Sequence, residues 1–202
     1  DADGPGPLVR QWVQQHITQR YARLTGDDRP RMVDFLVAVN TALQSDIAYT
    51  VRMEPGVQTP DTTLAKALGS CRDSAWLLVA VLREAGLAAR FVSGYLMPAE
   101  LEVGVASDAK VHAWLEYWDG AWCAWDPRLD CQPDGRHVVI GYARRRADIP
   151  LICGDISMKI GQHEVMVRGE NVFFPLKEFE LLEYLMQNKG RVMTRHQLID
   201  RI

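Results

Sequence analysis

The segment from Ser70 to Gly86 constrains the fold more than any other part of the chain. Its central run, residues 75–82, reads Ala-Trp-Leu-Leu-Val-Ala-Val-Leu and is apolar almost all round. Ser70 is a favourable N-cap residue, Asp73 follows at the spacing of a capping box, and Gly86 is a typical helix stop. A helix that is apolar all round is stable only when it is buried. The sequence therefore predicts one buried central helix.

Cys71 is expected in the first turn of this helix. There the free backbone N–H groups and the helix dipole favour a negatively charged sulfur. A thiol attacks an amide or an ester only as the thiolate, so it needs a base that holds its proton and a third group that orients the base. An imidazole and a carboxylate in suitable settings are the partners that this cysteine requires.

Two neighbouring strands supply both groups. Residues 110–118 and 121–127 read as strands, and they meet at Asp119-Gly120, a strong hairpin signal. The first strand carries His112 and the second carries Asp126. The sequence thus predicts a Cys-His-Asp triad, provided that the hairpin brings the two side chains together.

The length of the hairpin loop decides whether His112 and Asp126 can meet. A two-residue loop pairs Trp118 with Ala121, which puts the histidine and the aspartate on opposite faces of the sheet. A three-residue loop pairs Trp118 with Trp122 and makes them diagonal neighbours on one face. The other face then holds a plausible core: Val111, Ala113, Leu115, Tyr117, Cys123 and Trp125. A real triad therefore predicts the longer loop or a bulge.

The remaining elements follow from periodicity and turn residues. Further helices are predicted at residues 8–24, 30–43 and 63–68, strands at 47–53, 89–96 and 137–140, and loops at 54–62 and 97–108. Beyond residue 157, three short strands (157–160, 164–168 and 171–174) precede a helix at 177–188 and a last helix capped by Thr194.

Length and composition set broad limits. A chain of 202 residues with 48% hydrophobic and 24% charged residues suits one domain of about 150 residues with a small appendage. The net charge of −3 gives no argument for nucleic acid or an anionic membrane, and no apolar run approaches the ~20 residues of a membrane span. The four cysteines form no Cys-x-x-Cys pair, so we expect reduced thiols, a cytoplasmic location and no metal or other cofactor.

Three stretches, residues 69–76, 112–114 and 125–127, resemble motifs of the bacterial transglutaminase-like superfamily in order and spacing, and residues 137–150 resemble its closing segment. The resemblance covers roughly residues 8–152. It implies an α+β fold with a papain-like core, in which helices pack on an antiparallel sheet.

The same resemblance implies the chemistry. Cys71 would be the nucleophile, His112 the base and acid, and Asp126 the group that orients the imidazole. Bacterial relatives are mostly thiol proteases or amidases and others are acyl transferases, so a peptide or another amide is the expected substrate. Water or an amine could resolve the thioester. Tryptophans near the motifs suggest a largely apolar cleft.

From residue 157 onward the chain resembles the winged-helix effector domain of response regulators. The resemblance covers the opening strands and the first two helices only, and the groove-reading helix and the wing would lie beyond Ile202. Residues 155–202 hold seven basic and seven acidic residues. We therefore expect two domains, 1–152 and 153–202, no DNA partner, and poorly buried apolar helix faces in the second domain.

Each site residue also has a plainer interpretation. Cys71 could be a buried structural thiol. His112 could be a histidine on a strand whose hydrogen-bonding groups are satisfied, and Asp126 could begin a turn before Pro127. The three together could bind a metal, although their spacing does not favour one. At the level of the whole chain, the alternative is a fragment of a transcriptional regulator with a non-catalytic front domain.

Overall fold

A computed structural model describes residues 5–52, 54, 56–100 and 109–199, which form two compact units. Residues 1–51 and 58–144 make up the first unit, and residues 52–57 and 145–202 make up the second. The domain boundary predicted between residues 152 and 153 stays a prediction. Within the described part of the chain, no helix combines the length and the apolar character that crossing a membrane requires.

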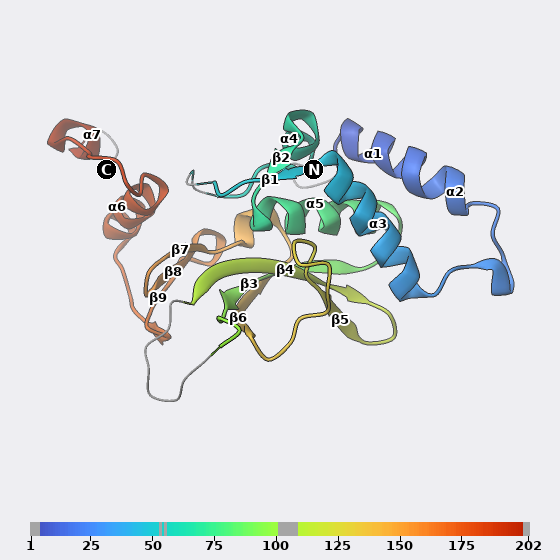
Figure 1. The fold of residues 1–202 in the computed structure, drawn as a ribbon. Coiled ribbons are helices and arrows are strands. Elements are labelled where there is room, and N and C mark those ends of the chain that lie inside the picture. Colours follow the sequence, from blue (N-terminus) through green and yellow to red (C-terminus); the bar gives the residue numbers. More distant parts are fainter. Residues whose placement is uncertain (1–4, 53, 55, 101–108, 200–202) are drawn as a thin grey trace. The chain divides into compact units, whose positions relative to one another are not determined.

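The first unit packs helices on an antiparallel sheet, as the sequence predicts (Figure 1). Its helices are α1 (Pro7–Val13), the π-helical η1 (Gln14–Thr18), α2 (Gln19–Tyr21), the 3-10 helix η2 (Gly26–Asp28), α3 (Met32–Asp46), α4 (Pro60–Lys66) and α5 (Cys71–Glu84). Its strands are β1 (Ala48–Tyr49), β2 (Leu68–Gly69), β3 (Ala89–Leu96), β4 (Lys110–Trp118), β5 (Trp122–Trp125) and β6 (His137–Ala143). The main sheet has the order β5-β4-β3-β6, while β1 and β2 form a separate parallel pair.

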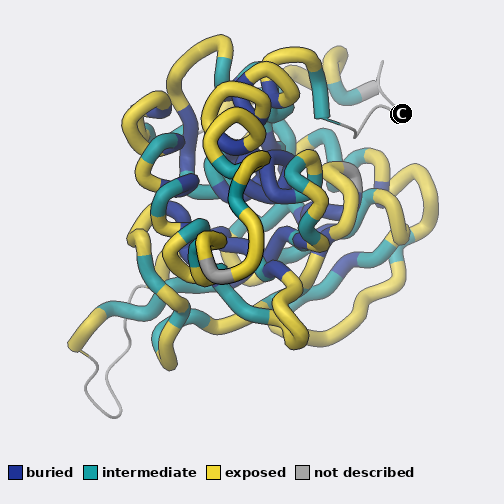
Figure 2. Tube along the Cα trace, turned by 90° about the vertical axis from the view of Figure 1, so that its right-hand side faces the viewer, coloured by how far each residue is buried: buried dark blue, intermediate teal, exposed yellow. Residues whose placement is uncertain are grey.

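Helix α5 is the buried central helix of this unit. Every side chain from Ala75 to Leu82 is buried, and the helix packs on β3 and β4 (Figure 1). In Figure 2 the buried residues of the chain are dark blue and the exposed ones yellow. The predicted capping box is present: the Ser70 backbone N–H donates to Asp73 Oδ2 over 2.9 Å. Gly86 follows the helix with a φ of +91°, a backbone conformation that glycine adopts without strain. Burial of each large apolar side chain contributes about 1.5–3 kcal/mol, so α5 anchors the unit.

Several element boundaries differ from the prediction; among them, the expected helix 8–24 divides into α1, η1 and α2, and the expected strand 171–174 is the two-residue β10 (Glu170–Asn171). Helix α4 begins at Pro60, three residues early, because the Thr59 hydroxyl accepts the Thr62 backbone N–H over 3.1 Å and proline suits the first helical position. Strand β1 keeps only two residues of the predicted 47–53, and Met53 lies outside the described residues. The predicted loop 97–108 is described only as far as residue 100.

The β4–β5 hairpin has the longer loop. Trp118 pairs with Trp122, which leaves three residues in the turn. The expected core face of the hairpin is largely buried, with Ala113, Leu115, Tyr117 and Trp125 at most 4% exposed. Two residues of this face depart from it: Val111 is 51% exposed, and Cys123 is partly exposed. The argument from loop length therefore predicted the register of the hairpin correctly.

Strand β6 carries a bulge where it pairs with β3. Ser93 pairs with Gly141, but Gly94 pairs with Val139, so Ile140 is an extra residue. The shift places His137 opposite Leu96. A Cβ atom at Gly94 would overlap the Val138 carbonyl oxygen and the ring of Trp114, so the absence of a side chain allows this close approach.

The second unit is built on a smaller antiparallel sheet of order β10-β9-β8-β7. Its elements are η3 (Arg146–Asp148), β7 (Leu151–Cys153), β8 (Ile156–Lys159), η4 (Ile160–Gln162), β9 (Glu164–Val167), β10 (Glu170–Asn171), α6 (Leu176–Gln187) and α7 (Arg195–Ile199). Met158, Val165, Phe179 and Met186 form its core. Leu185 of α6 is 41% exposed and Phe173 is 87% exposed. Burial of the apolar helix face is thus partial, and better than we expected for Phe179 and Met186.

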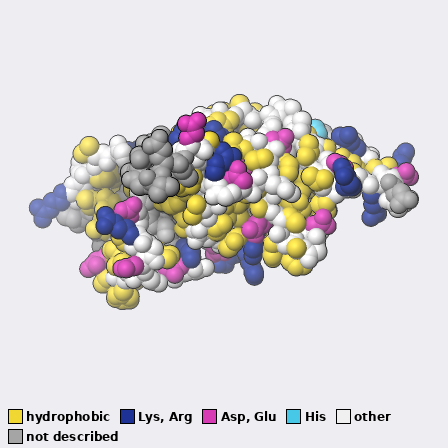
Figure 3. Space-filling view, turned by 60° about the horizontal axis from the view of Figure 1, so that its bottom comes forward, with side chains coloured by type: hydrophobic (Ala, Val, Ile, Leu, Met, Phe, Trp, Pro, Cys, Tyr) yellow, Lys and Arg dark blue, Asp and Glu magenta, His cyan; other side chains and the backbone are white. Residues whose placement is uncertain are grey.

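Charged side chains of both signs are interspersed on the face shown in Figure 3. In the first unit, Arg90 pairs with Glu116 at 2.6 Å. In the second unit, Lys159 pairs with Glu164 at 2.7 Å, and Arg168 Nε donates to an Asp155 oxygen at 2.9 Å. These pairs match the balanced charge that the sequence shows.

Candidate active site

Cys71 is the first residue of α5 and is partly exposed. Interaction with its thiol is among the causes that raise the pKa of the His112 imidazole. The start of a capped helix is also where backbone N–H groups stabilise a negative sulfur. Cys71 thus occupies the position that the sequence predicts for a nucleophile.

His112 and Asp126 meet across the β4–β5 hairpin. His112 Nε2 lies 2.6 Å from Asp126 Oδ2, and the two side chains are 3% and 0% exposed. A separation this short is that of a charge-assisted hydrogen bond, in which the ring N–H donates to the carboxylate. The structure therefore brings the predicted histidine and aspartate together.

Hydrogen bonds surround the carboxylate of Asp126. Oδ1 accepts the backbone N–H groups of Arg128 and Leu129 over 2.9 and 3.2 Å. Oδ2 accepts from His112 and also lies 3.1 Å from Nε2 of His137. Burial raises the pKa of Asp126, but the hydrogen bonds from His112, His137 and Leu129 outweigh it and hold this pKa below its usual value. The group is therefore a carboxylate at neutral pH.

The same network acts on His112. Burial lowers its pKa, but hydrogen bonds to Asp126 and Cys71, together with the charges of both groups, raise the pKa to about 9. The ring is therefore positively charged at neutral pH. Because Nε2 faces the carboxylate, Nδ1 is the nitrogen left for the sulfur. A charged imidazole beside a thiol favours the thiolate.

His137 is a site residue that the sequence analysis missed. Its side chain is 1% exposed, and Trp114 packs edge-on against its ring at 5.2 Å between centroids. The sequence indicates only a strand here. The pattern within one strand contains no sign of the β6 bulge, and that bulge is what turns His137 toward Asp126.

The ligand atoms of His112, Asp126 and His137 lie within 4.8 Å of one another, a spacing that could hold a metal ion. The metal set considered from the sequence had Cys71 in place of His137. Two ligands of a tetrahedral zinc ion lie about 3.3 Å apart, given bonds of about 2.0 Å. The 2.6 Å between His112 Nε2 and Asp126 Oδ2 is shorter, and one oxygen faces both rings. Hydrogen bonding accounts for this geometry better than a metal does.

From the sequence, two groups could bind an oxyanion: the backbone N–H of Cys71, which is the better candidate, and the side-chain amide of Gln58, which is more simply a solvated loop residue. The backbone N–H of Gln58 donates to Asp73 Oδ1 over 2.8 Å, and its side-chain Nε2 lies 3.3 Å from both the Leu68 carbonyl oxygen and Asp73 Oδ2. The residue thus ties its segment to the start of α5. The backbone N–H of Cys71 stays the predicted oxyanion donor.

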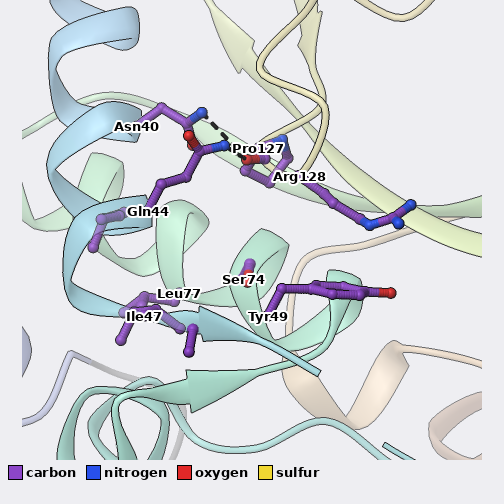
Figure 4. Close-up of a pocket in the computed structure, with 10 residues that line it drawn as sticks. Asn40, Gln44, Ile47, Tyr49, Ser74, Leu77, Pro127 and Arg128 are labelled. Carbon is purple, nitrogen blue, oxygen red and sulfur yellow. Dashed lines mark hydrogen bonds between the residues drawn. The ribbon is translucent and has the colours of Figure 1, made fainter. Parts of the chain in front are cut away.

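A cavity of about 350 Å³ adjoins the site (Figure 4). Its lining consists of Asn40, Leu43, Gln44, Ile47, Ala48, Tyr49, Ser74, Leu77, Pro127 and Arg128. Ser74 follows Cys71 by three residues on α5, so both lie on one side of the helix. Burial raises the pKa of Tyr49, and an electrostatic interaction with Cys71 adds to the effect.

The lining of this cavity matches part of the expectation. It is more apolar than polar, but among the described residues no tryptophan contributes to it. The side-chain amides of Asn40 and Gln44 donate to the Pro127 carbonyl oxygen over 3.2 and 2.7 Å, and this contact fixes the turn after β5 (Figure 4). The Arg128 guanidinium lies over the ring of Tyr49, 4.5 Å from its centroid.

Comparison with known proteins identifies two segments. Residues 15–127 match the transglutaminase-like superfamily, and residues 169–202 match the C-terminal domain of transcriptional regulatory proteins. The protein Mb2599c of Mycobacterium bovis is 36% identical over 134 residues, which cover 60% of this chain and 42% of that protein. The sensory transduction protein RegX3 of Mycolicibacterium smegmatis is 58% identical over 52 residues, which cover 26% of this chain and 23% of RegX3. The chain thus spans less than half of either relative.

A solved structure shares the fold. The crystal structure of a proposed cysteine protease from Cytophaga hutchinsonii is similar with a TM-score of 0.52 and 21% identity, over 69% of this chain and 44% of that one. This likeness supports the predicted α+β fold of the papain-like type.

Proposed function

Because this chain belongs to the transglutaminase-like superfamily, we propose that it is a cysteine-dependent amide hydrolase or acyl transferase. The observation that carries the proposal is the buried pair of His112 and Asp126, 2.6 Å apart, together with Cys71 at the start of α5, whose thiol is among the causes of the raised pKa of His112. Thiol catalysis requires a thiol, a base and a group that orients the base, and we assign these roles to Cys71, His112 and Asp126.

The proposed reaction starts from a Cys71 thiolate and a His112 imidazolium. The sulfur attacks the carbonyl carbon of an amide, which forms a C–S bond and an oxyanion. As the oxyanion collapses, the C–N bond breaks and the imidazolium gives its proton to the leaving nitrogen. An amine departs and a thioester remains.

The second half-reaction restores the pair. The neutral His112 takes a proton from water, and the resulting oxygen nucleophile attacks the thioester carbon. The C–S bond breaks, a carboxylic acid leaves, and the sulfur departs as the thiolate beside the imidazolium. An amine in place of water gives a new amide and makes the reaction an acyl transfer. In both halves Asp126 holds the imidazole in one orientation and stabilises its charge.

Alkylation with iodoacetamide tests the proposal without a known substrate. Peptide-resolved mass spectrometry measures the rate at each cysteine from pH 4 to pH 10, and Cys123 and Cys153 serve as internal references. We expect Cys71 to react at pH 6 faster than a free thiol with a pKa of ~8.5, and His112→Gln to remove this advantage. A Cys71 that reacts no faster than the reference thiols overturns the proposal.

A second measurement separates hydrolysis from transfer. An activated ester such as p-nitrophenyl acetate should give a burst of p-nitrophenol, with the acetyl group on Cys71. Hydroxylamine added in excess competes with water for the thioester. A product that is mainly the hydroxamate indicates an acyl transferase, whereas mainly acetate indicates a hydrolase.

The match of residues 169–202 to regulatory proteins favours a second candidate, a transcriptional-regulator element in which the front unit is not catalytic. A DNA mobility shift measured at several salt concentrations tests it. Sequence-specific binding by a Cys71→Ala variant, combined with an unreactive Cys71 in the parent chain, would reverse our order of preference.

A further inference from the structure

The carboxylate of Asp126 is held by two imidazoles, and the proposed triad uses only one of them. His137 Nε2 lies 3.1 Å from Oδ2, the same oxygen that His112 approaches at 2.6 Å. The two rings come from β6 and β4, and their centroids are 6.0 Å apart. Since the proposed roles of Cys71, His112 and Asp126 do not involve the second ring, its burial beside them requires an explanation.

The hydrogen bonds of His137 place a proton on the nitrogen that faces Asp126. The backbone N–H of Asp134 lies 3.1 Å from Nδ1 of His137, and Asp134 Oδ1 lies 3.1 Å from the same nitrogen. In the neutral ring Nδ1 accepts the backbone N–H, and in the charged ring Nδ1–H donates to the carboxylate. In both forms Nε2 carries hydrogen and donates to Asp126.

We infer that His137 is a positioning residue, which keeps Asp126 ionised and aimed at His112. The inference rests on the function proposed above. A second donor on Oδ2 lowers the basicity of Asp126, and the hydrogen bond from His137 is among the causes that hold its pKa down. The carboxylate therefore stays ionised to a lower pH than His112 alone would allow, and the thiolate beside His112 stays stabilised with it.

The fold provides for this contact in a specific way. If β6 paired with β3 without the bulge, with Ile140 opposite Gly94, His137 would pair one residue further along β3 and point to the opposite face of the sheet. Trp114 then packs against His137 from the same face, in the space that Gly94 leaves open. A bulge that re-aims one side chain toward a site is a recurring device in sheets.

The test compares His137→Leu with His137→Gln in the full chain. Leucine fills the space without a donor, whereas the glutamine amide nitrogen can occupy the place of Nε2. We expect His137→Leu to move the low-pH midpoint of the Cys71 alkylation profile upward by about half a pH unit or more, which slows the reaction with iodoacetamide about threefold at pH values below that midpoint. His137→Gln should keep the parent profile. His16→Gln is the matched control, because His16 is an exposed histidine in η1. It should change neither the midpoint of the pH profile nor the rate of Cys71 alkylation.

The outcomes separate this inference from the function on which it rests. A parent Cys71 that is not activated, with His112→Gln and Asp126→Asn without effect, sinks the proposed function. If those two variants slow the alkylation of Cys71 but His137→Leu keeps the pH profile of the parent chain, only the proposed role of His137 is wrong. One equivalent of Zn²⁺ that binds the parent and not His137→Leu would replace the hydrogen-bond account with a metal site. Should the leucine variant not fold, His137→Asn removes the donor near Asp126 in a polar side chain and gives the same readout.

Discussion

Two aspartates of the first unit, Asp73 and Asp126, are both completely buried, yet their surroundings differ in kind. Asp73 accepts from the backbone and hydroxyl of Ser70 and from the Gln58 backbone, groups that do not titrate near neutral pH. Asp126 accepts from two imidazoles. Burying a carboxylate costs free energy at either place unless its lone pairs are satisfied. The chemistry of the donors, and not burial, therefore separates a structural carboxylate from a catalytic candidate.

Of the substitutions that test this comparison, Asp126→Asn should have the largest effect, a loss of Cys71 reactivity. Without the carboxylate, the His112 imidazolium loses its main stabilising partner, and the Cys71 thiol returns toward ordinary ionisation. A thiol with a pKa of ~8.5 is about 3% ionised at pH 7, so alkylation of Cys71 should slow about 30-fold. Peptide-resolved alkylation at pH 7 measures the change. An unchanged rate would mean that Asp126 is as structural as Asp73.

Replacement of Asp73 by asparagine should affect stability instead. The variant loses a charged acceptor of the capping box and of the contact to Gln58, and we expect a cost of about 1–2 kcal/mol. Urea unfolding measures the loss. The pH at which Cys71 becomes reactive should stay where it is in the parent; a shift like that of Asp126→Asn would remove the distinction between the two carboxylates.

The surroundings of Asp126 and of Asp73 should also differ in how pH changes their contribution to the free energy of unfolding. The pKa of His112 is raised in the folded chain to about 9, so its contribution is fully present below the unfolded value of ~6.5 and is lost as pH rises through 9. The lowered pKa of Asp126 gives a contribution that is present above ~3.9 and is lost as pH falls further.

The measurement is the difference in unfolding free energy between the parent and His112→Gln. We expect this difference to shrink by about 2–3 kcal/mol between pH 6.5 and pH 9. The difference between the parent and Asp73→Asn should stay level over the same range. A flat curve for His112→Gln would contradict the raised pKa.

Arg136→Ala should have the smallest effect. Arg136 pairs with Asp134 at 2.9 Å, at the exposed outer end of the hydrogen bonds that lead to Asp126. Exposed ion pairs contribute less than about 1 kcal/mol, and the Asp134 backbone N–H still supports His137. The rate of Cys71 alkylation should change less than about twofold; a larger loss would extend the functional network to the surface.

Much of the site was predictable because its determinants are local in sequence. The cap at Ser70, the apolar run of α5 and the alternation along the hairpin are all short-range patterns, and they predicted the contact between His112 and Asp126. The three-residue loop of the hairpin followed from one requirement, that His112 and Asp126 lie on the same face of the sheet. Local chemistry also explains the early start of α4, through Thr59 and Pro60.

The rest depends on contacts between distant segments. The pairing of β3 with β6 joins residues more than 40 positions apart, and the bulge there leaves no trace in the alternation of either strand. His137 was therefore predicted only as part of a strand. The cavity likewise draws its wall from α3 and the turn after β5, elements whose packing no single-segment pattern specifies.

The bulge in β6 also bears on how related sequences should be compared. A relative whose β6 kept all these residues but paired with β3 without the bulge would retain Cys71, His112 and Asp126, yet its His137 would face away from the carboxylate. A comparison that scores only the three motifs would count such a relative as intact. The pairing of β6 with β3 around Ile140 is therefore as informative about this site as the identity of its residues.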